Sequence, residues 1–331
     1  MSTQKGNQPT MQPTMIEGSH VARNRLGSFF NQARMLLVLI FLVALFAVLS
    51  PYFLKLTNIY AIGLTISVIG IVCIGQSLIL LTGAFDLSVG GIAGLSGMIV
   101  AILTKQYGNY WGWFFLGLAV GTGVGLVNGL LITKLRINAL ITTLSMMTIL
   151  SGMVWLTSGG FAIGVNLPTF RFLGTTRLAS IPLPIIILVL LYAVFYVVLR
   201  FTVFGRYVYS IGGNAEAARL SGINVDRMRI LVYTLSGLLS GFGGIILASR
   251  LGSAQVDAGS QYPINSIAAC VLGGISIAGG EGVIWGSLIG VAIVGVLQSG
   301  LIMVGMPSYY QWIATGVVLL AAVYLDQLRK G

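Results

Sequence analysis

Two acidic residues stand in glycine-rich breaks between long apolar runs. Asp86 lies in TGAFDLSVGG (82–91) and Glu281 in AGGEGVIWG (278–286), each as the one acid of its break. An ionisable residue between membrane segments is a functional candidate, but a proton relay or an ion site would need a partner, and neither break contains His or Lys. We therefore favour helix capping, by Asp86 for a helix that starts at Leu87 or Ser88 and by Glu281 for one that starts near Val283.

Other residue types of catalytic and metal sites are sparse. Cys73 and Cys270 lie in apolar stretches with no second Cys or His at ligand spacing, and the single histidine, His20, stands in a polar N-terminal stretch. Buried thiols that act as small hydrophobic side chains are the simplest interpretation, so we expect neither a metal nor a disulfide. There is no Walker sequence Gly-x-x-x-x-Gly-Lys-Ser/Thr and no nucleophile beside a base. These observations predict a protein that is not an enzyme and holds no cofactor.

The composition shows which solvent surrounds these residues. Of 331 residues, 8% are charged and 56% are hydrophobic, and the mean hydropathy is +0.97. A soluble domain has about 25% charged residues, so this chain must be covered mostly by lipid. Apolar runs near the length of about 20 residues that a bilayer needs recur from residue 35 onwards. They predict an all-α polytopic membrane protein with about ten spans, at 35–53, 59–81, 88–103, 111–132, 139–157, 182–199, 230–248, 264–278, 283–302 and 309–325. The spans at 88–103 and 264–278 are short, as broken or half-spanning helices are in transporters.

The basic residues are divided unevenly between the two sides of these spans. Thirteen of the 18 fall on the side of the N-terminus, and five fall on the other: Lys55, Lys105, Arg171, Arg177 and Arg250. Because cytoplasmic loops are enriched in Lys and Arg, both termini are predicted to be cytoplasmic. The net charge of +11 then marks this face and not a nucleic-acid site. Residues 1–34 are predicted to be a disordered cytoplasmic tail, followed by a transmembrane domain over 35–331.

The cytoplasmic loop predicted over 200–229 contains the sequence of a short helix. Asn214 is a favoured N-cap, Glu216 stands in the first turn, Arg219 stands near the end, and Gly222 suits the left-handed position after the last turn. These signals predict a helix over Ala215–Ser221. Isolated helices shorter than about 12 residues are marginal in water, so this helix needs a surface on which to pack. Its own spans and a partner protein are the two alternatives.

Polar side chains inside the apolar spans are candidates to line a passage. They include Asn128, Thr142 and Gln298. For any one of them, a hydrogen bond between helices is the more common role. Glycine is abundant, with 45 residues, and the stretches GTGVGLVNGLL (121–131) and GLLSGFGG (237–244) predict closely packed helices, because small residues let backbones approach in lipid.

Three stretches resemble motifs of one protein family. FGRYVYSIGGNAEAARLSGINVDRMR (204–229) is similar to the cytoplasmic coupling segment of ribose-type permeases, the membrane subunits of ABC importers for monosaccharides. GAFDLSVGGIAGLSG (83–97) resembles the signature of that family, and VLGGISIAGGEGVIWGSLIG (271–290) resembles its glycine-rich C-terminal motif. The likeness runs from about residue 35 to the end of the chain. Ala84 and Phe85 stand where the family usually has Gly and Ile, next to Asp86.

This resemblance implies a fold, a role and partners. It implies a permease in the bacterial inner membrane that pairs with a second copy or a paralogue, with ABC ATPase subunits that bind the ATP, and with a periplasmic or lipid-anchored sugar-binding protein. Residues 214–221 would form the coupling helix in a groove of the ATPase, and the basic residues Arg206, Arg219 and Arg227 would meet its acidic groups or serve only to keep the loop inside. The residues carried over are, for coupling, Asn214, Ala215, Glu216, Ala217, Ala218, Arg219, Leu220, Ser221 and Arg206, and, for the signature loops, Gly83, Asp86, Ser88, Gly90, Gly279, Gly280 and Glu281.

The sequence is compatible with two other functions. A permease of the same superfamily could carry nucleosides or branched-chain amino acids. A secondary transporter working alone would use Asp86 and Glu281 to carry its coupling ions.

Overall fold

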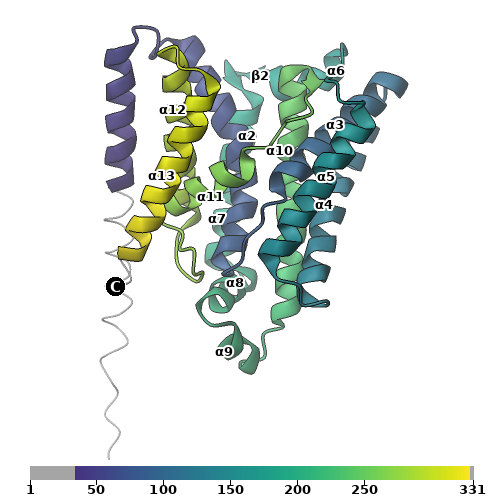
Figure 1. The fold of residues 1–331 in the computed structure, drawn as a ribbon, viewed down its shortest axis with the longest axis vertical. Coiled ribbons are helices and arrows are strands. Elements are labelled where there is room, and N and C mark those ends of the chain that lie inside the picture. Colours follow the sequence, from purple (N-terminus) through teal and green to yellow (C-terminus); the bar gives the residue numbers. More distant parts are fainter. Residues whose placement is uncertain (1–33, 329–331) are drawn as a thin grey trace, which may run out of the picture.

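The computed structural model describes residues 34–328, which form helices that stand side by side between the two ends of the molecule (Figure 1). Within this range, seven helices are long and apolar enough to cross a membrane: α2 (Leu56–Leu81), α3 (Val89–Tyr107), α4 (Tyr110–Thr133), α5 (Ala139–Ser158), α7 (Leu183–Phe201), α10 (Val225–Leu251) and α12 (Ile284–Met303). Three further apolar helices are shorter, namely Arg34–Leu49, α11 (Tyr262–Leu272) and the apolar part Tyr309–Ala321 of α13 (Ser308–Leu328). The prediction of an all-α polytopic membrane protein is confirmed. The tail predicted over 1–34 lies, except for Arg34, outside the described residues.

Glycine faces join the central helices. Helix α10 packs against α2, α3 and α4, and its Gly237 lies directly against the backbone of Gly121 and Gly125 in α4. A side chain at Gly244 would collide with the backbone of Ala93 in α3. The close packing predicted from the two glycine-rich stretches is therefore confirmed. These contacts hold α3, α4 and α10 together in the middle of the bundle.

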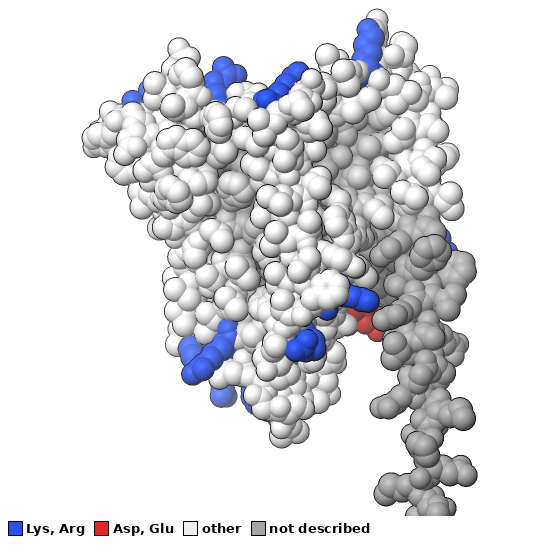
Figure 2. Space-filling view, turned by 180° about the vertical axis from the view of Figure 1, so that it is seen from behind, with Lys and Arg blue, Asp and Glu red and all other residues white. Residues whose placement is uncertain are grey.

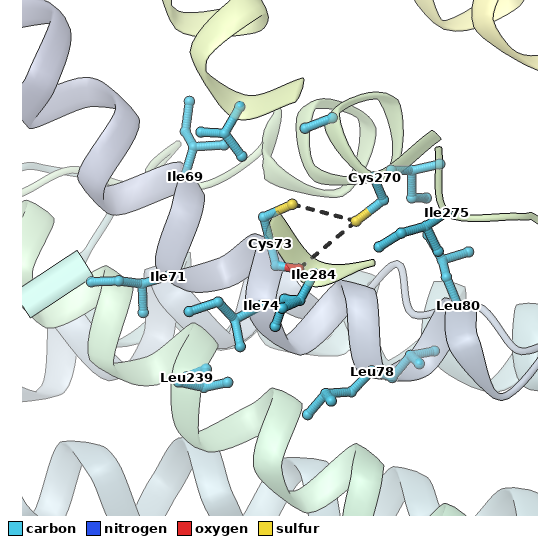
Figure 3. Packing of buried hydrophobic residues seen from close by; sticks show 14 of the residues in the cluster. Ile69, Ile71, Cys73, Ile74, Leu78, Leu80, Leu239, Cys270, Ile275 and Ile284 are labelled. Atoms are coloured by element: carbon cyan, nitrogen blue, oxygen red, sulfur yellow. Dashed lines mark hydrogen bonds between the residues drawn. The ribbon is translucent and has the colours of Figure 1, made fainter. Parts of the chain in front are cut away.

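A second centre of packing surrounds the two cysteines. Cys73 of α2 and Cys270 of α11 are fully buried among isoleucines and leucines, and their Sγ atoms lie 3.3 Å apart (Figure 3). The prediction of buried small side chains is confirmed for both residues. Their positions in the chain gave no sign that they touch, because the contact forms only when α11 packs on α2.

Short elements close the two ends of the bundle. At one end are α6 (Pro168–Thr175) and two small antiparallel pairs, β1 (Ile163–Gly164) with β4 (Ser253–Ala254) and β2 (Arg177–Leu178) with β3 (Ile181–Pro182). At the other end are α8 (Val203–Gly213) and α9 (Ala215–Leu220), with α9 at the tip (Figure 1). Lys and Arg gather at both ends, and the surface between them is almost entirely uncharged (Figure 2). This is the distribution expected of a protein that crosses a bilayer.

Two predicted boundaries were wrong. The span predicted over 88–103 is not short, because α3 continues through the polar residues Thr104–Gln106 and ends only at Gly108, where φ is +82°. The predicted cytoplasmic loop 200–229 is mostly helical, since it contains the end of α7, then α8 and α9, and the first turn of α10. Polar residues in a row did not mark a break in either place, because helix ends that project from a membrane are polar as well.

The segment between α10 and α11 differs most from the prediction. Residues 249–263 were expected as an outer loop before a short span over 264–278. Instead, the chain leaves α10 at Gly252, pairs β4 with β1, and then passes down between the helices, so that Gly259 lies against Gly90 of α3. Helix α11 starts only after this descent and has 11 residues. The expectation of a broken span is confirmed here, and the break lies on the N-terminal side of the helix.

Candidate functional site

Helix α9 has the local structure that its sequence predicts. The side chain of Asn214 accepts hydrogen bonds from the backbone N–H groups of Glu216 and Ala217, both at 3.0 Å. Glu216 lies in the first turn, and the helix ends at Leu220, one residue before the predicted end. Gly222 has φ +86°, and the chain closes the helix through a bond of 3.1 Å from the N–H of Ile223 to the carbonyl of Ala218. The N-cap, the charges and the left-handed glycine are all confirmed.

The surface on which α9 packs belongs to this chain. Ala218 is 4% exposed and forms a small cluster with Ile211 of α8 and Val225 of α10. Of the two alternatives for this surface, the helices of the chain itself are therefore the one found, because α8 and α10 supply an apolar contact. Leu220 points the other way, however, and is 82% exposed. An apolar side chain at the tip of the molecule remains free for another surface.

Helix α8 connects this tip to the two glycine-rich signature loops. A side chain at Gly212 would collide with the carbonyl of Leu81 and the amide nitrogen of Gly280. Gly279 lies against Gly83, and the N–H of Gly280 donates to the carbonyl of Leu81 at 3.0 Å. The loops after α2 and after α11 therefore touch each other and the end of α8, although some 200 residues separate them in the chain. We call this contact the glycine junction.

A tyrosine reinforces the glycine junction. The hydroxyl of Tyr209 on α8 donates a hydrogen bond of 2.9 Å to the carbonyl of Gly282, which precedes α12. This bond ties α8 directly to the residues that precede α12. Tyr209 and Gly212 do not stand out in the sequence, since 73 residues separate the two ends of the Tyr209 bond and no spacing rule relates them.

Asp86 is fully buried beside the glycine junction and holds a small polar network. One carboxylate oxygen accepts from the N–H of Ser88 at 2.8 Å and from its hydroxyl at 2.6 Å, and the Ser88 hydroxyl accepts from Asn128 of α4 at 2.8 Å. The other oxygen lies 3.5 Å from the hydroxyl of Ser236 on α10. Burial raises the pKa of Asp86 above its ordinary value, and the hydrogen bonds from the two serines oppose this. The predicted capping role is wrong in its detail, because α3 starts at Val89 with Ser88 as its N-cap and no side chain makes a capping bond there. Asp86 instead binds Ser88 and so ties the start of α3 to α4 and α10.

Glu281 does not act as the predicted cap. Helix α12 starts at Ile284, its N-cap is Val283, and no side chain makes a capping bond there. The Glu281 side chain is exposed, whereas its backbone carbonyl accepts from the N–H of Ser276 at 3.0 Å. Asp86 and Glu281 therefore differ in environment, although the two breaks have similar sequences.

A basic cavity opens at the same end of the molecule. It has a volume of about 850 Å³ and is lined by Arg136 from the α4–α5 turn and by Arg219, Asp226 and Arg229 from α9 and α10. Arg219 lies 3.7 Å from Asp226, a half-exposed pair that contributes little to stability. Arg206 is exposed on α8 and does not line the cavity. Of the basic residues expected to meet a partner, Arg219 is thus the one placed at both the tip and the cavity.

The three candidate passage residues have different surroundings. Asn128 is buried and bonded to Ser88, and Thr142 donates to the carbonyl of Asn138 in its own helix at 3.0 Å. Asn128 therefore makes the bond between helices that was the more common alternative, whereas Thr142 bonds only within α5. Gln298 lines a cavity of about 300 Å³ together with Arg250, Gln261, Asn265 and other residues of α2, α11 and α13. Its place among polar groups keeps it a candidate.

Comparison with known proteins decides the family. Residues 58–323 match the family described as branched-chain amino acid transport system / permease component. The chain belongs to this permease family. The permease is 39% identical to the ribose import permease protein RbsC of Escherichia coli (strain K12) over 307 residues, covering 92% of this chain and 96% of the relative. It is 42% identical to RbsC of Bacillus subtilis (strain 168) over 295 residues, covering 88% and 91%. No solved structure gave a significant match.

A relative with a different sugar in its name is almost as similar. The permease is 37% identical to the L-arabinose ABC transporter permease protein AraH of Azospirillum brasilense over 309 residues, covering 93% of this chain and 91% of the relative. The resemblance to ribose-type permeases, which was based on three motifs, is therefore confirmed along nearly the whole chain. The permease is a multi-pass membrane protein.

Proposed function

We propose that this permease is the membrane subunit of an ATP-driven importer for a monosaccharide. The observation that carries the proposal is the continuous similarity to permeases named for ribose and for L-arabinose over about nine-tenths of the chain. The chain supplies the passage, and ATP is bound by a separate ATPase subunit. Because the passage and the ATP-binding site would lie on separate chains, the importer needs a mechanical connection between them. A coupling contact at α9 and the adjoining glycine junction would supply it.

The proposed mechanism follows the contacts from the tip inwards. An ATPase groove would receive α9 through its exposed Leu220, as an amphipathic helix is received in a groove. Because Ala218 is packed on α8 and α10, a push on α9 moves both helices. Helix α8 passes this movement to the loops after α2 and α11 at Gly212, and to the start of α12 through Tyr209. Closure of the ATPase would in this way change the packing of four membrane helices together.

The arrangement in the membrane and the partners complete the proposal. The ten apolar helices would give about ten membrane segments with both termini in the cytoplasm, in the inner membrane of a bacterium. A second copy or a paralogue would form the other wall of the passage. The outer segment between α5 and α7, with α6 and the short strands, would face a periplasmic or lipid-anchored sugar-binding protein.

Uptake by the complete importer tests this function. Cells that express the permease with its ATPase and binding protein should accumulate labelled ribose or arabinose, and cells that lack only the ATPase should not. Uptake that persists without the ATPase would contradict the proposal and favour a transporter working alone. The family description names branched-chain amino acids, so unlabelled leucine and a nucleoside should be included as competitors. Competition by either one, but not by sugars, would overturn the choice of substrate.

A further inference from the structure

The descending segment between α10 and α11 reaches the middle of the membrane. Gly97 of α3 lies against Gly244 of α10, seven residues before the outer end of α10, and Gly90, seven residues further down α3, lies against Gly259. At 1.5 Å per helical residue, Gly259 is about 20 Å below the outer end of α10. A bilayer core is about 30 Å thick. Residues around Gly259 therefore lie near its centre, where α11 begins as a half-helix (Figure 1).

Asp257 is an exposed carboxylate at this depth. It is two residues from Gly259, and its neighbour Ala258 lies against Gly94 of α3. Within residues 34–328, Asp257 takes part in no ion pair. A charged side chain and non-helical backbone are tolerated at membrane depth only where they are buried in protein or line a water-filled cavity. Since Asp257 is exposed, this face of the permease must border water in the assembled transporter.

The surroundings of Asp257 have the chemistry of a sugar site. A cavity of about 210 Å³ is lined by Asp257 and Ser260, by Ser151 and Trp155 of α5, and by Gly90 and Gly91 of α3. Trp155 is 55% exposed. A carboxylate and two hydroxyls can accept and donate hydrogen bonds to several sugar hydroxyls, and the face of an indole ring can cover the apolar face of a sugar. No basic residue is among the groups that line this cavity, which suits a neutral ligand.

Gly90 and Gly91 of the signature motif form one side of this cavity. A side chain at Gly90 would collide with the carbonyl of Gly259, and one at Gly91 would lie 2.9 Å from Leu150 of α5. The glycines thus let α3, α5 and the descending segment approach until Trp155 and Asp257 border one small space. The signature motif therefore does more than allow close helix packing, because it sets the distance between the two walls of the cavity.

We infer that Asp257, Trp155 and Ser260 form a monosaccharide-binding position about halfway across the membrane, where the carboxylate binds sugar hydroxyls as the sugar passes. This inference rests on the proposed function. It goes beyond the proposed passage, because it gives the permease a sugar preference of its own.

Thiol accessibility tests whether the position borders water. In membranes with the complete importer, Asp257→Cys should react with a charged, water-soluble thiol reagent, and saturating ribose or arabinose should slow the reaction. Leu156→Cys, next to Trp155 and outside the cavity lining, is the matched control, and sugar should not slow whatever reaction it shows with the same reagent. The parent chain gives the background, since Cys73 and Cys270 are buried. An Asp257→Cys protein that reacts only with a lipid-soluble reagent would overturn the inference.

Sugar preference tests whether the position binds the substrate. Asp257→Asn and Trp155→Ala should each lower uptake about tenfold or more, the effect of losing a hydrogen bond to a charged group or a stacked ring, and should change the ratio of ribose to arabinose uptake. Asp257→Glu and Trp155→Phe should restore part of it. Each variant should be recovered from membranes in the same amount as the parent and in complex with the ATPase, which shows that the variants fold and assemble.

The two proposals fail in different ways. If the parent importer shows no ATP-dependent sugar uptake, the proposed function itself is wrong. If the parent takes up sugar but Asp257→Asn and Trp155→Ala keep its rate and its sugar ratio, only the binding position is wrong. A loss of uptake with an unchanged ratio and with loss of the assembled complex would mean that these residues are structural, and it would also overturn the inference.

Discussion

Asp86 shows how a buried acid in a membrane protein can be structural. Its carboxylate accepts two hydrogen bonds from Ser88 and lies near Ser236, so it connects the start of α3 with α10. No basic side chain pairs with it among the described residues. A group buried in this way keeps its place through hydrogen bonds, and its charge opposes folding.

Stability should therefore fall as Asp86 ionises. Burial raises its pKa in the folded state, so the folded state holds the proton more tightly than the unfolded state does. The stability that this group contributes is present below its unfolded pKa and is lost as the pH rises through the raised folded pKa. In a series of thermal midpoints from about pH 4 upwards, Asp86→Asn should remove part of this decline, because the amide oxygen still accepts from Ser88 and carries no charge.

A second substitution separates the acceptor from the charge. Asp86→Leu should lower the free energy of unfolding by roughly 1–3 kcal/mol, since the Ser88 donors are left without an acceptor. If Asp86→Asn abolishes uptake but leaves stability and its pH dependence unchanged, the structural role is wrong and a proton-carrying role is favoured.

Gly212 and Gly213 offer a matched pair of substitutions. An added methyl group at Gly212 would collide with Leu81 and Gly280, whereas nothing lies within 4 Å of one at Gly213. Gly212→Ala should cost about 1–3 kcal/mol of stability, as overpacking does, and should uncouple ATP hydrolysis from sugar uptake. Gly213→Ala should change neither quantity noticeably. Equal effects of the two substitutions on uptake would show that the glycine junction does not transmit movement.

At the scale of the element, α9 depends on its cap. Asn214→Ala removes both capping bonds and should destabilise the helix by about 1 kcal/mol. Amide hydrogens of residues 217–220 should then exchange about five times faster, while those of α10 are unaffected. Asn214→Asp keeps the acceptor, so its amide hydrogens should exchange like those of the parent. If the amide hydrogens of Asn214→Ala also exchange at the parent's rate, the cap does not stabilise α9.

The elements also show what the sequence can and cannot predict. Apolar runs and caps gave the helices and α9 correctly, because both depend on residues close in the chain. The descent of residues 255–261 was missed because these residues are polar and look like an outer loop. Their depth depends on contacts of Gly259 and Ala258 with α3. Asp257 was overlooked for the same reason, although an acid between two apolar runs was the signal that singled out Asp86.

At the scale of the whole molecule, the charges and the contacts divide the permease into three levels. Basic residues mark the two ends (Figure 2), the glycine junction lies just inside the end that carries α9, and the cavity beside Asp257 lies near the centre. A path of direct contacts leads from α9 through α8 to the loops after α2 and α11 and to α12. We expect an ATPase to act on this path at α9.

A crosslink from the tip of the molecule tests whether the ATPase contacts α9. A photoreactive amino acid in place of Leu220, which is 82% exposed, should crosslink to the ATPase subunit in membranes that contain the complete, active importer. The same amino acid in place of Tyr107, which is 61% exposed at the opposite end of the bundle, should not. If position 220 gives no crosslink to the ATPase, or no more than position 107, then α9 is not the coupling element.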